Sequence, residues 1–120
     1  MQVWLKRAYE EPQPQDGKRI LVDRLWPRGV SKEDAAIDEW MTSIAPSTEL
    51  REWYGHDPDR WNEFRQRYFK ELDAAPEAVE ELLGHVREGR VTLVFGAKDV
   101  EHSHARALKK YLELQTGETL

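Results

Sequence analysis

Cysteine is absent from the 120-residue sequence. The chain therefore has no disulfide framework, no thiol nucleophile and no thiolate metal site, as is common in a reducing compartment. No apolar run approaches the ~20 residues that a membrane-spanning helix needs. The opening MQVWLKRAYEEP lacks the charged and apolar segments of a signal peptide. We therefore expect a cytoplasmic protein with no membrane partner.

A basic surface is also missing, because the formal net charge is −5 at pH 7. Proteins that coat nucleic acid non-specifically need a basic face, so the composition argues against a nucleic-acid partner. A negative net charge is still compatible with a small basic crevice on an otherwise acidic protein. The apolar fraction of 39% and the charged fraction of 34% are typical of one soluble globular domain. We expect residues 1–120 to form that single domain.

Sequence motifs of the common cofactor and catalytic sites are absent too. The chain has no G-x-G-x-x-G, P-loop, G-x-S-x-G or H-E-x-x-H pattern. No sequence motif therefore identifies a cofactor, and any cofactor of this protein stays unknown.

Apolar runs and helix-start signals define the expected elements. Strands are expected at 2–7, 18–26 and 90–97, and 37–41 is either a short strand or an extended segment. Helices are expected after the capping residues Ser31 and Ser47, over 55–72, over 76–89 and from about residue 100. The long crossover between the second and third strands predicts that they run parallel. The predicted fold is α/β: a small, mostly parallel sheet of three to four strands flanked by helices.

Two polar clusters follow predicted strands. DRLWPRG begins at Asp23, and AKDVEHSH begins at Ala97. Ligands bind outside the carboxyl ends of parallel strands, so the two clusters should meet in one crevice. Arg7, at the end of the first strand, is expected to join them.

In the first cluster, Arg24 and Arg28 are candidates to bind a carboxylate or phosphate through their planar guanidinium groups. An internal ion pair between Asp23 and Arg24 is the structural alternative. Trp26 is a candidate to stack on a ligand ring, although a place in the core is the simpler interpretation.

In the second cluster, Lys98 precedes a predicted helix start, where anions bind. Asp99 is most simply the N-cap, with acid–base work as the alternative. His102 and His104 are candidates for acid–base work, but at i and i+2 on a regular helix they would point in nearly opposite directions. His56, next to the predicted cap Asp57, is a fourth candidate that spacing alone cannot place.

Three segments carry a family resemblance: KRILVDRLWPRGVSKED, APSTELREWYGHDPDRWNEFRQRY and VTLVFGAKDVEHSHARALKKYL. In order, over about residues 2 to 114, they resemble the YeaO-like branch of the family called domain of unknown function 488. The resemblance implies a small single-domain cytoplasmic protein of bacteria or archaea and supplies no established activity. The motif positions carried over are Asp23, Arg24, Trp26, Pro27, Arg28, Gly29, His56, Asp57, Lys98, Asp99, His102 and His104.

The leading hypothesis is a crevice that binds a phosphate- or carboxylate-bearing small molecule, with hydrolase or transferase chemistry if the protein is an enzyme. Substrate-binding candidates are Arg7, Arg24, Trp26, Arg28 and Lys98; catalytic candidates are His56, Asp99, His102 and His104. Three alternatives stay open. The first is a non-catalytic nucleotide- or nucleic-acid-binding module that stacks bases on aromatic side chains such as Trp53 and Tyr54, which could equally form a homodimer surface. The second is a metal-dependent hydrolase using His56, Asp57, Glu101 and His104. The third is a purely structural salt-bridge network.

Overall fold

Four parallel strands form the centre of the molecule. The computed structural model describes all residues from 1 to 120. The strands are β1 (Val3–Arg7), β2 (Lys18–Leu21), β3 (Glu39–Trp40) and β4 (Val91–Phe95), and they lie in the order β1-β4-β2-β3. Every neighbouring pair is parallel. The predicted α/β fold and the parallel pairing of β2 with β4 are confirmed.

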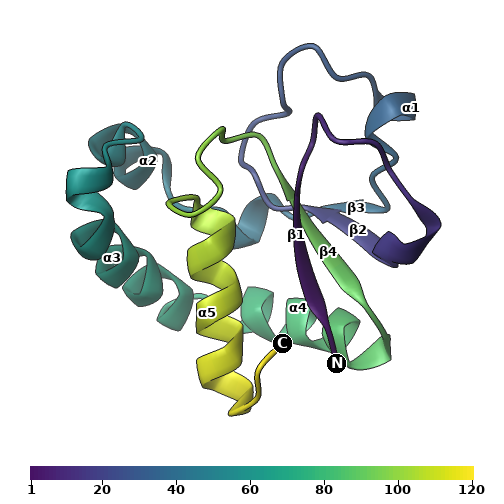
Figure 1. The fold of residues 1–120 in the computed structure, drawn as a ribbon. Helices are drawn as coiled ribbons and strands as arrows, with labels where there is room; N and C mark the ends of the chain where they lie inside the picture. The colour runs from purple at the N-terminus through teal and green to yellow at the C-terminus, as the bar shows by residue number, and fades with distance from the viewer.

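The helices cover one face of the sheet more fully than the other (Figure 1). The long helices are α3 (Trp61–Asp73), α4 (Pro76–Glu88) and α5 (His104–Thr116). The shorter ones are α1 (Lys32–Ala35), α2 (Thr48–Tyr54) and three single 3-10 turns, η1 (Pro14–Asp16), η2 (Thr42–Ile44) and η3 (Pro58–Arg60). None of these helices is long and apolar enough to span a membrane.

Serine side chains begin three of the helices. Ser31, Ser47 and Ser103 each accept a hydrogen bond from the backbone N–H three residues ahead, which satisfies an otherwise unpaired donor of the first turn. The caps at Ser31 and Ser47 are as predicted. The predicted helix 55–72 divides at Trp61, because Asp57 caps the 3-10 turn η3 and α3 follows it.

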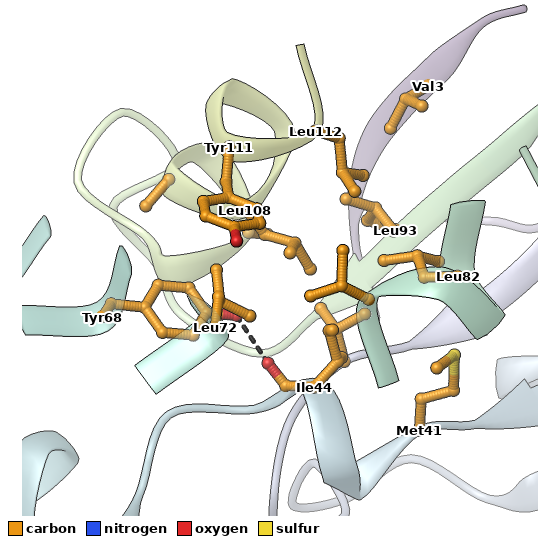
Figure 2. Close-up of a cluster of buried hydrophobic side chains, with 14 of the residues drawn as sticks. Val3, Met41, Ile44, Tyr68, Leu72, Leu82, Leu93, Leu108, Tyr111 and Leu112 are labelled. Carbon is orange, nitrogen blue, oxygen red and sulfur yellow. Dashed lines mark hydrogen bonds between the residues drawn. The ribbon is translucent and has the colours of Figure 1, made fainter. Parts of the chain in front are cut away.

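The main core lies between one face of the sheet and the helices. Alternate residues of β4, Val91, Leu93 and Phe95, point into it, together with Val3 from β1. Figure 2 shows Val3 and Leu93 among side chains of α3, α4 and α5, such as Leu72, Leu82 and Leu112. Tyr68 is fully buried, and its hydroxyl donates to the Ile44 carbonyl at 2.6 Å. That bond satisfies the one polar atom that this large side chain brings into the core.

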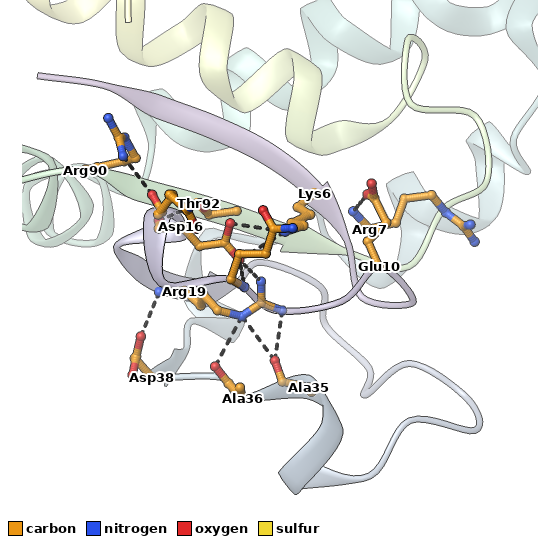
Figure 3. Close-up of polar contacts among 12 residues, drawn as sticks. Lys6, Arg7, Glu10, Asp16, Arg19, Ala35, Ala36, Asp38, Arg90 and Thr92 are labelled. Atoms are coloured by element: carbon orange, nitrogen blue, oxygen red, sulfur yellow. Dashed lines mark hydrogen bonds and ion pairs between the residues drawn. The ribbon is translucent and has the colours of Figure 1, made fainter.

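The other face of the sheet carries a small apolar cluster and a buried charge network. Leu21 and Val94 pack with Ala8, and Trp26 packs against them from the loop. Beside this cluster, the carboxylate of Asp16 binds Lys6 and Arg19 (Figure 3). Ile20, Leu21 and Val22 are all fully buried, so the apolar run of β2 is covered on both faces, as its sequence predicted.

Candidate functional site

A cavity of about 210 Å³ opens where the carboxyl ends of β2 and β4 meet α2 and the start of α5. Its apolar wall includes Leu25, Tyr54 and Phe64. Its acidic and basic lining residues are Asp23, Arg24, Arg51, His56, His102 and His104. The two polar clusters of the sequence therefore lie at the same end of the sheet, as parallel strands require.

Asp23 joins the three elements around the cavity. Its Oδ2 accepts the backbone N–H of Gly96 at 2.9 Å, and its Oδ1 lies 3.1 Å from Nε2 of His104. The same His104 Nε2 lies 3.0 Å from the carbonyl oxygen of Val22. Because both neighbours are acceptors, Nε2 must carry a proton. A Cβ at Gly96 would lie 3.1 Å from Oδ2 of Asp23, so glycine lets the β4 end approach this carboxylate closely.

Asp99 orients the second histidine. Its Oδ2 lies 2.8 Å from Nδ1 of His102, and its Oδ1 accepts the His102 N–H at 3.2 Å. The hydrogen bond from the His102 side chain lowers the pKa of Asp99 below its ordinary value. The edge of Trp61 meets the His102 ring, with centroids 5.4 Å apart. Asp99 and Trp61 therefore contact the His102 imidazole from two sides.

Tyr54 holds the backbone of the same turn. Its hydroxyl donates to the His102 carbonyl at 2.6 Å. Burial, and then the nearby carboxylates of Asp99 and Asp57, raise the pKa of Tyr54 to about 12. Tyr54 therefore stays a neutral hydrogen-bond donor throughout the physiological pH range.

Two expectations about AKDVEHSH need correction. Ser103, not Asp99, is the N-cap of α5, which begins at His104 and not near residue 100. Asp99 instead closes the turn that precedes the helix. His102 lies in that turn and outside the regular helix, so the side chains of His102 and His104 need not point in opposite directions. Both histidines line the same cavity.

Two nitrogen-bearing side chains of the lining, Arg51 and His56, make no hydrogen bond or ion pair within the chain. Arg51 lies on α2 and is exposed, and His56 follows α2 in the left-handed conformation, with φ of 56°. Sequence reasoning selected His56 and missed Arg51. A signal existed: Arg51 and Tyr54 are i and i+3 on one short helix, so they share a face.

Two arginines that the sequence predicted to bind an anion instead donate hydrogen bonds to backbone carbonyls. Arg7 donates through Nε to Ala97 O at 2.9 Å and does not line the cavity. Arg24 does line it, but its Nε donates to Pro46 O at 3.1 Å and its Nη2 to Ala45 O at 3.3 Å. Arg24 therefore does not pair with Asp23, whose carboxylate faces His104.

The remaining substrate-binding candidates lie outside the cavity lining. Trp26 is partly buried, donates from Nε1 to Val30 O at 2.7 Å, and packs edge-on against Trp40. Arg28 and Lys98 are exposed. The core interpretation of Trp26 fits this position.

The other candidate sets are dispersed. Glu101 pairs with Arg106 at 3.1 Å and Asp57 with Arg60 at 3.7 Å, so the proposed metal ligands His56, Asp57, Glu101 and His104 do not form one group. Tyr54 is buried in the main core, and Trp53 is partly buried against it. These two aromatic side chains therefore do not form an exposed patch.

Relatives of this chain cover nearly its whole length. It is 45% identical over 111 residues to the uncharacterized protein Rv3073c of Mycobacterium tuberculosis, an alignment that covers 92% of each chain. It is 39% identical over 112 residues to the uncharacterized protein YeaO of Escherichia coli, covering 93% of this chain and 97% of YeaO. The comparison with solved structures gives no match. The model of the DUF488-N3i family, described as the inactive DUF488-N3 subclade, matches residues 2–119. The chain therefore belongs to this subclade, and with YeaO to the YeaO-like branch of DUF488.

Proposed function

We propose that the cavity binds a small phosphate- or carboxylate-bearing molecule and does not transform it. The observation that carries this proposal is the guanidinium of Arg51, which lines the cavity and has no partner within the chain. A guanidinium offers a planar fork of donors that matches carboxylate and phosphate oxygens. His56 also lines the cavity without a hydrogen-bond partner, and it can donate a further hydrogen bond.

The size of the cavity restricts the ligand. Its volume of about 210 Å³ is below the ~300–1,000 Å³ typical of pockets for drug-sized ligands. Inorganic phosphate or a compact organic acid fits this volume better than a dinucleotide. The apolar wall formed by Leu25, Tyr54 and Phe64 favours a ligand with a short carbon skeleton.

The family description and the bonding of the histidines support binding without turnover. The subclade is described as inactive. His104 donates its Nε2 proton to the Val22 carbonyl, which belongs to the scaffold, and the same nitrogen lies 3.1 Å from the Asp23 carboxylate. A histidine bound in this way positions the ends of the strands and has no free nitrogen on that side for a reacting group.

A second candidate function is acid–base chemistry by His102. Its Nδ1 is oriented by a carboxylate, the arrangement that fixes the tautomer of a general base and leaves Nε2 for the substrate. Hydrolysis of p-nitrophenyl phosphate is the direct assay. Turnover by the wild type that is lost in His102→Gln would favour this function over binding alone.

Thermal unfolding in the presence of phosphate, sulfate, acetate and citrate tests the proposal. A ligand at ~100 times its Kd stabilises the folded state by about 2.7 kcal/mol, which raises Tm by several degrees at this size. Arg51→Gln should abolish the rise while leaving the unliganded Tm nearly unchanged, because the side chain makes no bond to the protein.

Arg28→Gln is the matched control, because Arg28 is also exposed but lies outside the cavity. It should keep the rise in Tm. A rise that both variants keep would show that the anions act elsewhere. No rise with any anion in the wild type would refute anion binding.

A further inference from the structure

A second group of chemically reactive side chains lies away from this cavity. Glu39 on β3 and Glu81 and His85 on α4 place their ligand atoms within 4.8 Å of one another. Glu81 and His85 are one helical turn apart and therefore share a face of α4. None of the three lines the anion cavity, so the two sites can be tested separately.

The closest pair in this group has an unusual geometry. His85 Nε2 lies 2.6 Å from Glu39 Oε2. Both atoms are buried, and neither makes an aligned hydrogen bond. They therefore converge on one point without satisfying each other. An ion bound tetrahedrally with bonds of ~2.0–2.2 Å would require these two atoms to separate by less than ~1 Å.

We propose that Glu39, Glu81 and His85 bind a divalent transition-metal ion. One imidazole nitrogen with two carboxylates is a donor set suited to Zn²⁺ or Mn²⁺ and poorly suited to Mg²⁺, which prefers oxygen ligands and retains its waters. Glu81 is exposed, so the site has an open side from which the ion enters and at which water completes the coordination.

Lys18 determines which ring nitrogen of His85 carries the proton when no metal is bound. Its Nζ lies 2.9 Å from Nδ1 of His85. An ammonium only donates, so this contact makes Nδ1 the acceptor and leaves the proton on Nε2, which faces Glu39. Binding of the metal through Nε2 requires that proton to move to Nδ1, so the contact between Nδ1 and Lys18 Nζ must break.

Calorimetric titration with Zn²⁺, with Mg²⁺ as the comparison ion, tests the proposal on the full chain. We expect saturable binding of one Zn²⁺ and no comparable binding of Mg²⁺. His85→Gln should weaken Zn²⁺ binding by roughly tenfold or more, because loss of an outer hydrogen-bond partner alone costs 10–100-fold. Lys18→Gln should strengthen it, because the amide oxygen can accept from Nδ1–H and the competing positive charge is gone.

Two further variants keep the test decisive. His102→Gln removes a histidine from the other site and should bind Zn²⁺ as the wild type does. If His85→Gln does not fold, Glu81→Gln replaces it, because this exposed side chain contributes little to packing. The proposal is overturned if the wild type binds no Zn²⁺. It is also overturned if these ligand variants bind Zn²⁺ as well as the wild type, or if only His102→Gln loses binding.

Discussion

The buried carboxylate of Asp16 should be among the most costly polar groups to remove. Its side chain is 1% exposed and that of its partner Arg19 is 4% exposed. Arg19 Nη1 lies 2.6 Å from Asp16 Oδ2, and Lys6 Nζ lies 3.1 Å from Oδ1. The Gln13 N–H donates to Oδ2 at 3.0 Å. Asp16→Ala removes all of these bonds and leaves a buried guanidinium without its counter-charge.

Removing one partner of a buried ion pair typically costs about 3–5 kcal/mol, a large part of the ~5–15 kcal/mol that stabilises a domain of this kind. The matching fall in Tm for a chain of 120 residues is roughly 10–20 °C. Urea unfolding followed by circular dichroism, with linear extrapolation to water, measures the free energy directly. Arg19 retains its bonds to the carbonyls of Ala35 and Ala36, which places our expectation at the lower end of the range.

An exposed ion pair provides the matched control. Glu63 and Arg67 form an i, i+4 pair on α3 with side chains 53% and 51% exposed. Glu63→Ala should cost only about 0.3–0.5 kcal/mol. The reasoning is refuted if Asp16→Ala costs less than about 1 kcal/mol, or no more than Glu63→Ala does.

The pH dependence of the same variant gives a second check. Burial alone would raise the pKa of Asp16, but the hydrogen bonds from the Gln13 N–H, Lys6 and Arg19 outweigh it and lower the pKa below its ordinary value. A depressed folded pKa contributes stability above the unfolded value near ~3.9, and this contribution is lost as pH falls through the folded value. The difference in stability between wild type and Asp16→Ala should therefore shrink on acidification from pH 7.

Two further predictions concern the tyrosines and the cavity. Burial, and then nearby carboxylates, raise the pKa of both Tyr54 and Tyr111 to about 12. The stability that these neutral hydroxyls contribute should be complete below pH ~10 and lost as pH rises towards 12. Absorbance at 295 nm, which follows tyrosine ionisation, and urea unfolding curves would measure both effects. Titration of both hydroxyls near pH 10 in the folded protein would contradict this. Asp23→Ala leaves the Gly96 N–H without its acceptor and removes the carboxylate that lies 3.1 Å from Nε2 of His104. It should therefore cost about 1.5–3 kcal/mol in urea unfolding, and unchanged stability would show that the carboxylate does not hold the strand ends together.

The sheet was predictable because its strands are the chain's buried apolar runs. VTLVF is rich in β-branched and apolar residues, KRIL leads into the apolar run Ile20–Val22, and each is followed by residues that break a strand. The crossover between them is too long for a hairpin, which favours parallel pairing. Once the pairing is parallel, Asp23 and Gly96 must lie at the same end of the sheet. The location of the cavity therefore followed from topology alone.

The start of α5 could not be predicted from local sequence, because AKDVEHSH offers two capping residues four positions apart. Asp99 and Ser103 are both good N-caps, and local sequence does not distinguish them. The structure uses both: Asp99 closes a turn through the His102 N–H, and Ser103 caps the helix. That extra turn before the helix brings His102 to the same side as His104.

The arginines show why cationic residues at strand ends are weak evidence for a ligand site. Strand ends and the loops that follow them carry carbonyl oxygens that no neighbouring strand pairs, and a buried carbonyl without a partner is costly. Arg7 and Arg24 satisfy such carbonyls, at Ala97 and at Pro46. Nothing in the sequence distinguishes a guanidinium that binds backbone from one that binds a ligand, because both uses need the same donors.

The residues left free for a ligand accordingly come from outside the sheet. Arg51 and His56 lie on α2 and just after it, where α2 already ends in a glycine cap and demands no side-chain donor. In a sheet this small, the side chains nearest the strand ends are used to hold the loops, as Asp23 and Arg24 are. A ligand must then be bound by the surrounding helices and turns. This is the physical reason for testing Arg51, and not the arginines of DRLWPRG, as the anion-binding residue.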